Sequence, residues 1–116
     1  MLNGASDRPE RYAYLAMQQL ISHGHEVVLV HPRLQQIEGQ PVLQDLSAVQ
    51  GSVDTLTMYV GPATSSGLAE KIVSLRPARV LFNPGAENPT LAQKLQARGI
   101  VTEEACTLVL LHTAQF

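Results

Sequence analysis

The sequence has a single cysteine, Cys106, so no disulfide can form within the chain and a disulfide-stapled secreted scaffold is excluded. No apolar run approaches the roughly 20 residues of a membrane-spanning helix, and the N-terminus lacks the basic-then-apolar pattern of a signal peptide. Eight Lys and Arg against ten Asp and Glu give a net charge of −2, so no basic field is available for nucleic acid or an acidic membrane. We therefore expect one small cytoplasmic globular domain spanning residues 1–116.

Apolar runs and helical patterns alternate along the chain. Continuous β-branched and apolar runs predict strands at 27–30, 56–60, 79–82 and 100–102. Apolar residues at helical spacing predict helices at 11–23, 68–75 and 89–98, and one short helical turn fits 45–50. The stretch 33–41 is polar and turn-rich, and the apolar run 107–111 fits a strand or a helix equally well. This order predicts an α/β fold: a doubly wound, mostly parallel sheet with helices on both faces.

In such a sheet, ligands bind beyond the carboxyl ends of the strands, so the residues that follow each strand are the informative ones. Here these loops are small, polar and rich in Gly and Pro, which suits close approach of backbone N–H groups to a phosphate. Gly4-Ala5-Ser6 predicts a tight turn before a helix whose end favours an anion. It is neither a full G-x-G-x-x-G nor a P-loop, and a turn glycine with a capping serine explains it nearly as well.

Eight short blocks of the sequence, in this order, carry a resemblance to a known family. They are Leu2-Asn3-Gly4-Ala5-Ser6, Pro9-Glu10-Arg11-Tyr12, His23-Gly24-His25, Val30-His31-Pro32-Arg33, Ile37-Glu38-Gly39, Val53-Asp54-Thr55, Asn83-Pro84-Gly85 and Ala105-Cys106-Thr107-Leu108. Together they resemble the small single-domain CoA-binding proteins, which are similar to the N-terminal CoA-binding domain of the succinyl-CoA synthetase α subunit. The resemblance covers essentially the whole chain.

The resemblance implies a Rossmann-like domain that holds CoA, or an acyl-CoA, through its nucleotide and pyrophosphate. It places Gly4, Ala5 and Ser6 at the phosphates, and Pro32 and Arg33 in the loop where the family usually has Asn-Pro-Lys. Arg33 would then bind the 3′-phosphate, which a guanidinium can grip with two donors. The remaining implied contacts lie along the adenosine and the pantetheine arm: Tyr59, Val60, Gly61, Pro62, Asn83, Pro84 and Gly85, with Cys106 near the end of the arm.

Two features depart from the family pattern. His31 stands where Asn is usual, so an imidazole would replace the amide hydrogen bond or would link CoA affinity to pH near about 6.5. The first strand is shorter than in family members, which raises the alternative of a natural start upstream of Met1.

For several other side chains of chemical interest, a purely structural role stands beside the functional one. Cys106 is either a small buried side chain or a partner for a mixed disulfide with CoA. Arg8 and Arg11 belong to a solvated charge cluster that would also offset phosphate charge. His23 and His25 are too sparse for a metal site, so we expect no metal, and His23 suits a helix C-terminus. Three tyrosines, at positions 12, 14 and 59, either pack within the fold or stack on adenine. Tyr59 is the preferred candidate for stacking.

The sequence therefore predicts a CoA-binding module without catalysis of its own. In the synthetases that this domain resembles, the phosphorylated histidine lies in a later domain, and no triad, metal cluster or P-loop lysine replaces it here. Such a module would act as a homodimer or with a separate ligase-like partner. One alternative is a binder of another nucleotide such as NAD, although His31-Pro32-Arg33 stands where an acidic residue would hold the ribose. The other alternative is a protein-interaction domain with a decayed ligand site.

Overall fold

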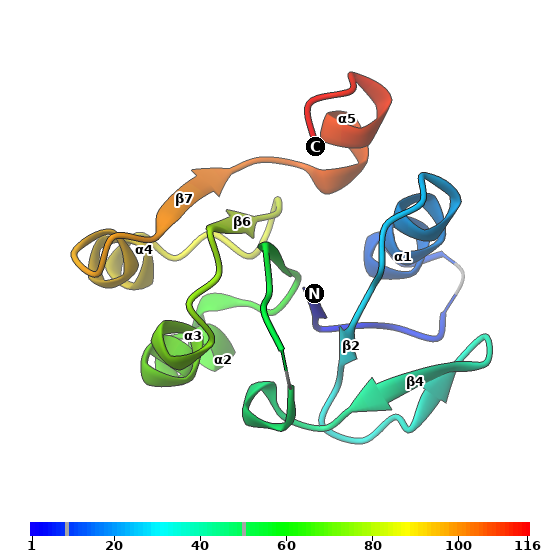
Figure 1. Cartoon of the computed structure of the whole chain (residues 1–116), viewed down its shortest axis with the longest axis horizontal. Helices are drawn as coiled ribbons and strands as arrows, with labels where there is room; N and C mark the ends of the chain where they lie inside the picture. The colour runs from blue at the N-terminus through cyan, green and yellow to red at the C-terminus, as the bar shows by residue number, and fades with distance from the viewer. Residues whose placement is uncertain (9, 50) are drawn as a thin grey trace.

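The computed structural model describes residues 1–8, 10–49 and 51–116, and its centre is one twisted sheet (Figure 1). The strands are β1 (Leu2–Asn3), β2 (Leu29–Val30), β3 (Gln36–Ile37), β4 (Gln40–Leu43), β5 (Thr55–Met58), β6 (Arg79–Phe82) and β7 (Val101–Glu104). Their spatial order is β3-β4-β2-β1-β5-β6-β7, and every pair is parallel except β3 with β4. Without β3, this is the 3-2-1-4-5-6 strand order of the Rossmann fold.

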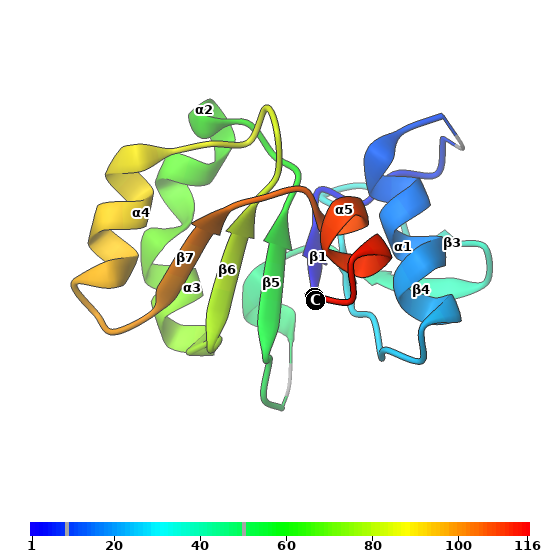
Figure 2. The same cartoon turned by 90° about the horizontal axis from the view of Figure 1, so that it is seen from above.

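Helices cover both faces of this sheet. They are α1 (Tyr12–Ser22), α2 (Pro62–Ser65), α3 (Ala69–Leu75), α4 (Pro89–Gln96) and α5 (Thr107–His112), with short 3₁₀ turns η1 (Leu46–Ala48) and η2 (Ser66–Leu68). Figures 1 and 2 show α1 beside α5 on one face, and α3 beside α4 on the other. Successive strand residues point to opposite faces, so Leu29 packs under α1 while Val30 packs in the core beneath α3 and α4. The predicted doubly wound α/β class is confirmed.

The boundaries show where local sequence signals suffice. The 79–82 strand forms as predicted, and Asn88 and Pro89 start α4: the Asn88 side chain accepts a hydrogen bond from the Leu91 N–H at 3.1 Å. The predicted helical turn at 45–50 is η1, although Gln50 lies outside the described residues, as does Pro9 of the second family block. The predicted helix at 68–75 is α3 preceded by η2. The run 107–111, undecided from sequence, is helix α5.

Two regions differ from their predictions, and the first is the strand predicted at 27–30, of which β2 covers only Leu29–Val30. The polar stretch 33–41 is not only turns, because it contains β3 and the start of β4. Glu38 and Gly39 form the two-residue turn between them, with φ of 50° and 77°, the left-handed backbone that such hairpin turns require. Pairing of β4 with β2, far away along the chain, extends the sheet at this edge. A two-residue strand gives no alternation to read, which is why the sequence pattern missed it.

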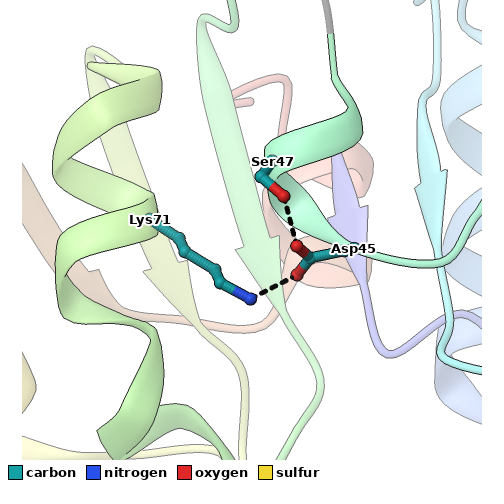
Figure 3. A network of polar contacts seen from close by, with 3 residues as sticks. All are labelled: Asp45, Ser47 and Lys71. Carbon is teal, nitrogen blue, oxygen red and sulfur yellow. Dashed lines mark hydrogen bonds and ion pairs between the residues drawn. The ribbon is translucent and has the colours of Figure 1, made fainter.

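An exposed polar network joins the η1 turn to α3 (Figure 3). The Lys71 Nζ lies 2.7 Å from the Asp45 Oδ1, and the Ser47 hydroxyl donates to the other oxygen of this carboxylate. The hydrogen bond from Lys71, followed by that from Ser47, lowers the pKa of Asp45. Both partners of the ion pair are well exposed, so it contributes at most about 1 kcal/mol to stability.

In residues 1–8, 10–49 and 51–116, no helix combines the length and apolar character needed to cross a membrane.

Candidate ligand-binding cleft

A cleft of about 620 Å³ opens at the carboxyl ends of the central strands. Its walls come from the loops after β1, β2, β5 and β6 and from the first turn of α1. Figure 2 shows β5 and β6 pointing toward this edge of the sheet. The chain runs outward from β1 in one direction through β2 and in the other through β5, so the cleft lies at the switch in strand order. Its volume is in the range of ligand sites, which span roughly 300–1,000 Å³.

The turn after β1 is held against two neighbouring strands. The N–H groups of Gly4 and Ala5 both donate to the Val30 carbonyl at 3.1 Å. Gly4 has a φ of +90°, and a β-carbon there would lie 2.9 Å from the Val60 Cγ1 and 3.1 Å from the Tyr59 carbonyl carbon. Both the backbone conformation and the lack of space therefore require glycine at this position.

This clamping changes which amides can serve an anion. Since the Val30 carbonyl already occupies the N–H groups of Gly4 and Ala5, the next two amides along the chain, those of Ser6 and Asp7, become the candidates. Neither is paired within the part of the chain that the structure describes. The Ser6 hydroxyl accepts from the Arg8 N–H at 3.1 Å, which shapes the loop ahead of the helix.

The N-terminus of α1 completes this wall. Arg11, Tyr12 and Ala13 line the cleft, and the capping position, Arg11, makes no side-chain cap bond. The first turn carries no acidic residue. The open N–H groups of a helix start and the positive end of its dipole both favour a bound anion.

Charged side chains around the cleft are mostly cationic. Arg8, Arg11 and Arg33 contribute three positive charges, whereas Asp7 is the single carboxylate in the lining. Within the described residues, the single ion pair shorter than 4.0 Å joins Lys71 to Asp45. No carboxylate of these residues therefore neutralises one of the three guanidinium groups. A cleft with this imbalance is suited to a ligand that carries several negative charges.

The loop after β2 has a defined shape. The His31 Nδ1 lies 3.0 Å from both the Arg33 N–H and the Leu34 N–H, and the His31 N–H donates to the Leu43 carbonyl at 2.9 Å. Because backbone N–H groups only donate, the Nδ1 atom must accept, and the proton of the neutral ring is on Nε2.

The sequence profile of the CoA binding domain family matches residues 1–112 of this chain. The chain belongs to the CoA binding domain family. Its fold matches a crystal structure of an uncharacterized protein with a TM-score of 0.92 at 39% identity, over 99% of this chain and 94% of that one. The uncharacterized protein YneT of Bacillus subtilis (strain 168) is 23% identical over 96 residues, which cover 83% of this chain and 71% of YneT.

The fold of this CoA-binding domain also occurs inside a larger enzyme. A dinucleotide-forming acetyl-coenzyme A synthetase 1 of Ca. Korarchaeum cryptofilum matches with a TM-score of 0.74, over 87% of this chain and 25% of the synthetase. The identity is 16%, so this comparison concerns the fold alone.

The structure brings most of the predicted site residues of this CoA-binding domain to one cleft. Those in its lining are Gly4, Ala5, Ser6, Arg11, His31, Arg33, Tyr59, Pro84 and Gly85, and those outside it are Pro32, Val60, Gly61, Pro62, Asn83 and Cys106. Asp7, Ala13 and Leu34 also line the cleft and were not predicted as site residues, whereas Arg8 was considered as an offset to phosphate charge and Tyr12 as a stacking side chain. Their proximity to the Gly4 turn and to Arg33 in the chain was the available signal.

Asn83 lies below the cleft in a buried polar network. Its Nδ2 donates to the Thr57 Oγ1 at 2.7 Å and to the Met58 carbonyl at 2.9 Å. Its Oδ1 accepts from the Thr107 N–H at 2.9 Å and from the Thr107 hydroxyl at 2.8 Å. All four hydrogen-bonding positions of this amide are thus used inside the protein, where Asn83 ties the start of α5 to β5.

The three tyrosines have different surroundings. Tyr59 lines the cleft, but its hydroxyl oxygen is buried and has no hydrogen-bond partner among the described residues. Burial raises the pKa of Tyr59 to about 12, against a smaller opposing effect of the nearby Thr107 and Thr57 hydroxyls, neither of which reaches hydrogen-bond geometry with it. Tyr14 is buried and donates to the Glu38 Oε1 at 2.8 Å, which fastens the β3–β4 turn to α1. Tyr12 is 70% exposed at the cleft rim, so it is the tyrosine most free to stack on a ligand.

Cys106 and the histidines outside the cleft have structural positions. Cys106 is half-buried at the capping position of α5. The His23 Nδ1 lies 2.7 Å from the Gln19 carbonyl near the end of α1, consistent with its predicted position at a helix C-terminus. His25 packs edge-on against Phe116. Within the described part of the chain, no three His, Cys, Asp or Glu side chains gather as a metal site would require.

Proposed function

We propose that this protein binds CoA or an acyl-CoA in the cleft and performs no chemistry on it. The observation that carries the proposal is the group of three arginines around the Gly4 turn and the open N-terminus of α1. CoA carries a pyrophosphate and a 3′-phosphate, so its charge matches this excess of cations. Membership of the CoA binding domain family supports the same ligand class.

We assign the pyrophosphate to the loop after β1 and the start of α1. The candidate donors are the N–H groups of Ser6 and Asp7 together with Arg8 and Arg11. Arg33, on the opposite wall after β2, is the candidate for the 3′-phosphate, because its exposed guanidinium can offer two donors to one phosphate. The pantetheine arm would then leave along Pro84 and Gly85, past the Tyr59 ring.

The absence of chemistry is supported by the residues around the cleft. Among the described lining residues, the titratable side chains with ordinary catalytic roles are Asp7, His31 and the two tyrosines. The His31 Nδ1 is already engaged by two backbone N–H groups, so it is not available there as a base. We therefore propose a carrier, a sensor, or a subunit that presents CoA to a second copy or to a ligase-like partner.

NAD and NADP are the competing ligands. An NAD site of this fold would place a carboxylate after β2 for the ribose hydroxyls, and Arg33 stands in that loop instead. An arginine there suits the 2′-phosphate of NADP as well as the 3′-phosphate of CoA, so NADP belongs in the test.

The test is thermal unfolding and titration calorimetry with CoA, dephospho-CoA, NAD, NADP and ATP at millimolar concentration. A ligand at 100 times its Kd stabilises the fold by about 2.7 kcal/mol, which raises Tm by roughly 10–20 °C in a domain of this size. We expect the largest rise with CoA, a smaller one with dephospho-CoA and none with NAD. A larger rise with NAD or NADP than with CoA would reject the proposal, as would no rise with any ligand. Light scattering of the CoA-loaded protein tests whether a second copy takes part.

A further inference from the structure

His31 organises the loop that carries Arg33. Its Nδ1 accepts two hydrogen bonds of 3.0 Å, from the backbone N–H groups two and three residues further along the chain. These bonds turn the chain sharply after β2 and bring the side chains of His31, Arg33 and Leu34 to the same cleft. Arg33 itself has no carboxylate partner within the described residues. The backbone position set by this turn therefore determines which part of the cleft its guanidinium can reach.

An asparagine would make the same turn. Asparagine side chains commonly accept hydrogen bonds from backbone N–H groups shortly downstream, and the Oδ1 of Asn and the Nδ1 of His are equally many bonds from the Cα. His31 therefore does with a ring nitrogen what an asparagine at this position would do with its amide oxygen.

The replacement differs from asparagine in one chemical respect. The single lone pair of Nδ1 disappears when the ring is protonated, and an N–H would then face the N–H groups of Arg33 and Leu34. An amide oxygen does not titrate at any ordinary pH. Histidine is also the side chain whose charge most readily changes between pH 5 and 8.

We propose that neutral His31 positions Arg33 for a ligand phosphate, and that protonation of its Nδ1 opens the 31–34 loop and weakens binding as pH falls. The effect on affinity rests on the proposed binding of CoA. The opening of the loop does not, because it needs only the two hydrogen bonds to Nδ1.

The surroundings of His31 bear on both states of the ring. The charged groups that line the same cleft are Arg33 on the His31 loop, and Asp7, Arg8 and Arg11 on the opposite wall. Tyr59 lines it from the end of β5, and β4 contributes the Leu43 carbonyl, which accepts from the His31 backbone N–H. Three guanidinium groups disfavour an additional positive charge, whereas Asp7 and a bound phosphate favour one. Attraction of an imidazolium for phosphate would strengthen binding at low pH, which is opposite in sign to the loop effect.

Two variants separate these effects. His31→Asn keeps an acceptor at the δ position and removes the titration, whereas His31→Gln places its amide one bond further out and leaves the δ position without an acceptor. The Kd for CoA is measured by calorimetry from pH 5.5 to 8 for the wild type and both variants. The 3′-phosphate of CoA titrates near about pH 6, as phosphate monoesters do, but this contribution is common to all three proteins and cancels in their ratios.

At pH 8 we expect His31→Asn to bind CoA within about threefold of the wild type, and His31→Gln about tenfold or more weaker, since two hydrogen bonds are lost. Between pH 8 and 5.5, wild-type affinity should fall about tenfold relative to that of His31→Asn. The same pH profile for the wild type and His31→Asn would overturn the proposal. A wild-type affinity that rises relative to His31→Asn would also overturn it, in favour of simple charge attraction.

A readout without ligand keeps this test independent of the proposed function. Nitrogen NMR of the imidazole should find Nδ1 unprotonated at pH 8, and the Arg33 and Leu34 amide resonances should move with the titration of His31. In His31→Asn these two amides should stay unchanged over the same range. If CoA fails to bind but the amides follow His31, the proposed function is wrong and the loop switch stands. If CoA binds and the amides ignore the protonation of His31, the switch is wrong and the proposed function stands.

Discussion

Gly4 and Val60 approach so closely that a β-carbon on Gly4 would lie 2.9 Å from the Val60 Cγ1. The contact joins the turn after β1 to the chain just beyond β5, the two walls between which the strand order reverses. The turn can therefore keep its position in the cleft only with glycine.

Gly4→Ala should destabilise the protein by roughly 2–4 kcal/mol, because alanine adds a left-handed backbone penalty and a clash with Val60 and Tyr59. Urea unfolding measures the loss. Gly24→Ala is the matched control: its φ is +85°, but among the described residues no atom beyond its chain neighbours lies within 4 Å of the added carbon, so it should cost only about 1–2 kcal/mol. Equal losses for the two variants would show that the contact with Val60 has no energetic weight.

Asn83→Ala should cost roughly 2–4 kcal/mol, because it leaves the buried Thr107 N–H without its acceptor and the hydroxyls of Thr57 and Thr107 with only each other as partners. Gln96→Ala also removes an amide that donates to a threonine hydroxyl, that of Thr102 at 2.6 Å, but this bond is exposed. The control should change stability by no more than about 0.5 kcal/mol. Chemical denaturation of both variants is the measurement, and similar small losses would contradict a structural role for Asn83.

Tyr59→Phe should leave stability unchanged near pH 7 or raise it by up to about 1 kcal/mol, because the lost hydroxyl is buried and unpaired among the described residues. Tyr14→Phe should instead lower stability by about 1 kcal/mol, since it removes the hydrogen bond to Glu38. Thermal unfolding of both variants against the wild type tests the contrast in sign. A marked loss for Tyr59→Phe would mean that its hydroxyl has a partner.

Tyr59 also predicts how stability depends on alkaline pH. Its folded pKa of about 12 lies above the ordinary value of 10.0, so the unfolded chain loses this proton first. The native state then binds more protons than the unfolded one, and stability must fall as pH rises from about 10 to about 12. The share due to this group is at most about 2 kcal/mol, given its partial exposure. The difference in unfolding free energy between the wild type and Tyr59→Phe, measured with urea at pH 9 and at pH 11.5, isolates this contribution. The same difference at both pH values would refute the assignment.

Arg33→Ala should weaken CoA binding by about 10- to 100-fold, the effect of losing a hydrogen-bonded charge on a phosphate. Binding of dephospho-CoA should change far less, because it lacks the 3′-phosphate. Arg98→Ala, outside the cleft lining, removes the same charge and should leave both affinities near the wild type. Calorimetry with the two ligands decides the matter: an equal loss for CoA and dephospho-CoA would reject the 3′-phosphate assignment.

Local signals in the sequence were sufficient for much of the fold. The β6 strand, with its run of apolar residues, and α4, with Asn88 and Pro89 at its start, depend on neighbours within a few residues. The alternation of such segments was enough to predict a doubly wound sheet, and hence the edge at which a ligand cleft would form. The loops after β1 and β2, with Gly4 and Arg33, were predicted to meet there, and they do.

The tertiary structure decided what depends on partners far away in the chain. The sequence alone fits the apolar run 107–111 to a strand or a helix. In the structure the Asn83 side chain accepts hydrogen bonds from the Thr107 N–H and hydroxyl, and the run forms helix α5. The β3–β4 hairpin exists because β4 pairs with β2. A two-residue strand such as β2 or β3 is too short for its sequence pattern to predict this pairing. Val60 dictates the glycine at position 4, and the orientation of the His31 ring determines which nitrogen accepts. Sequence encodes local preferences of the backbone, whereas contacts across the sheet are fixed only when distant segments are packed together.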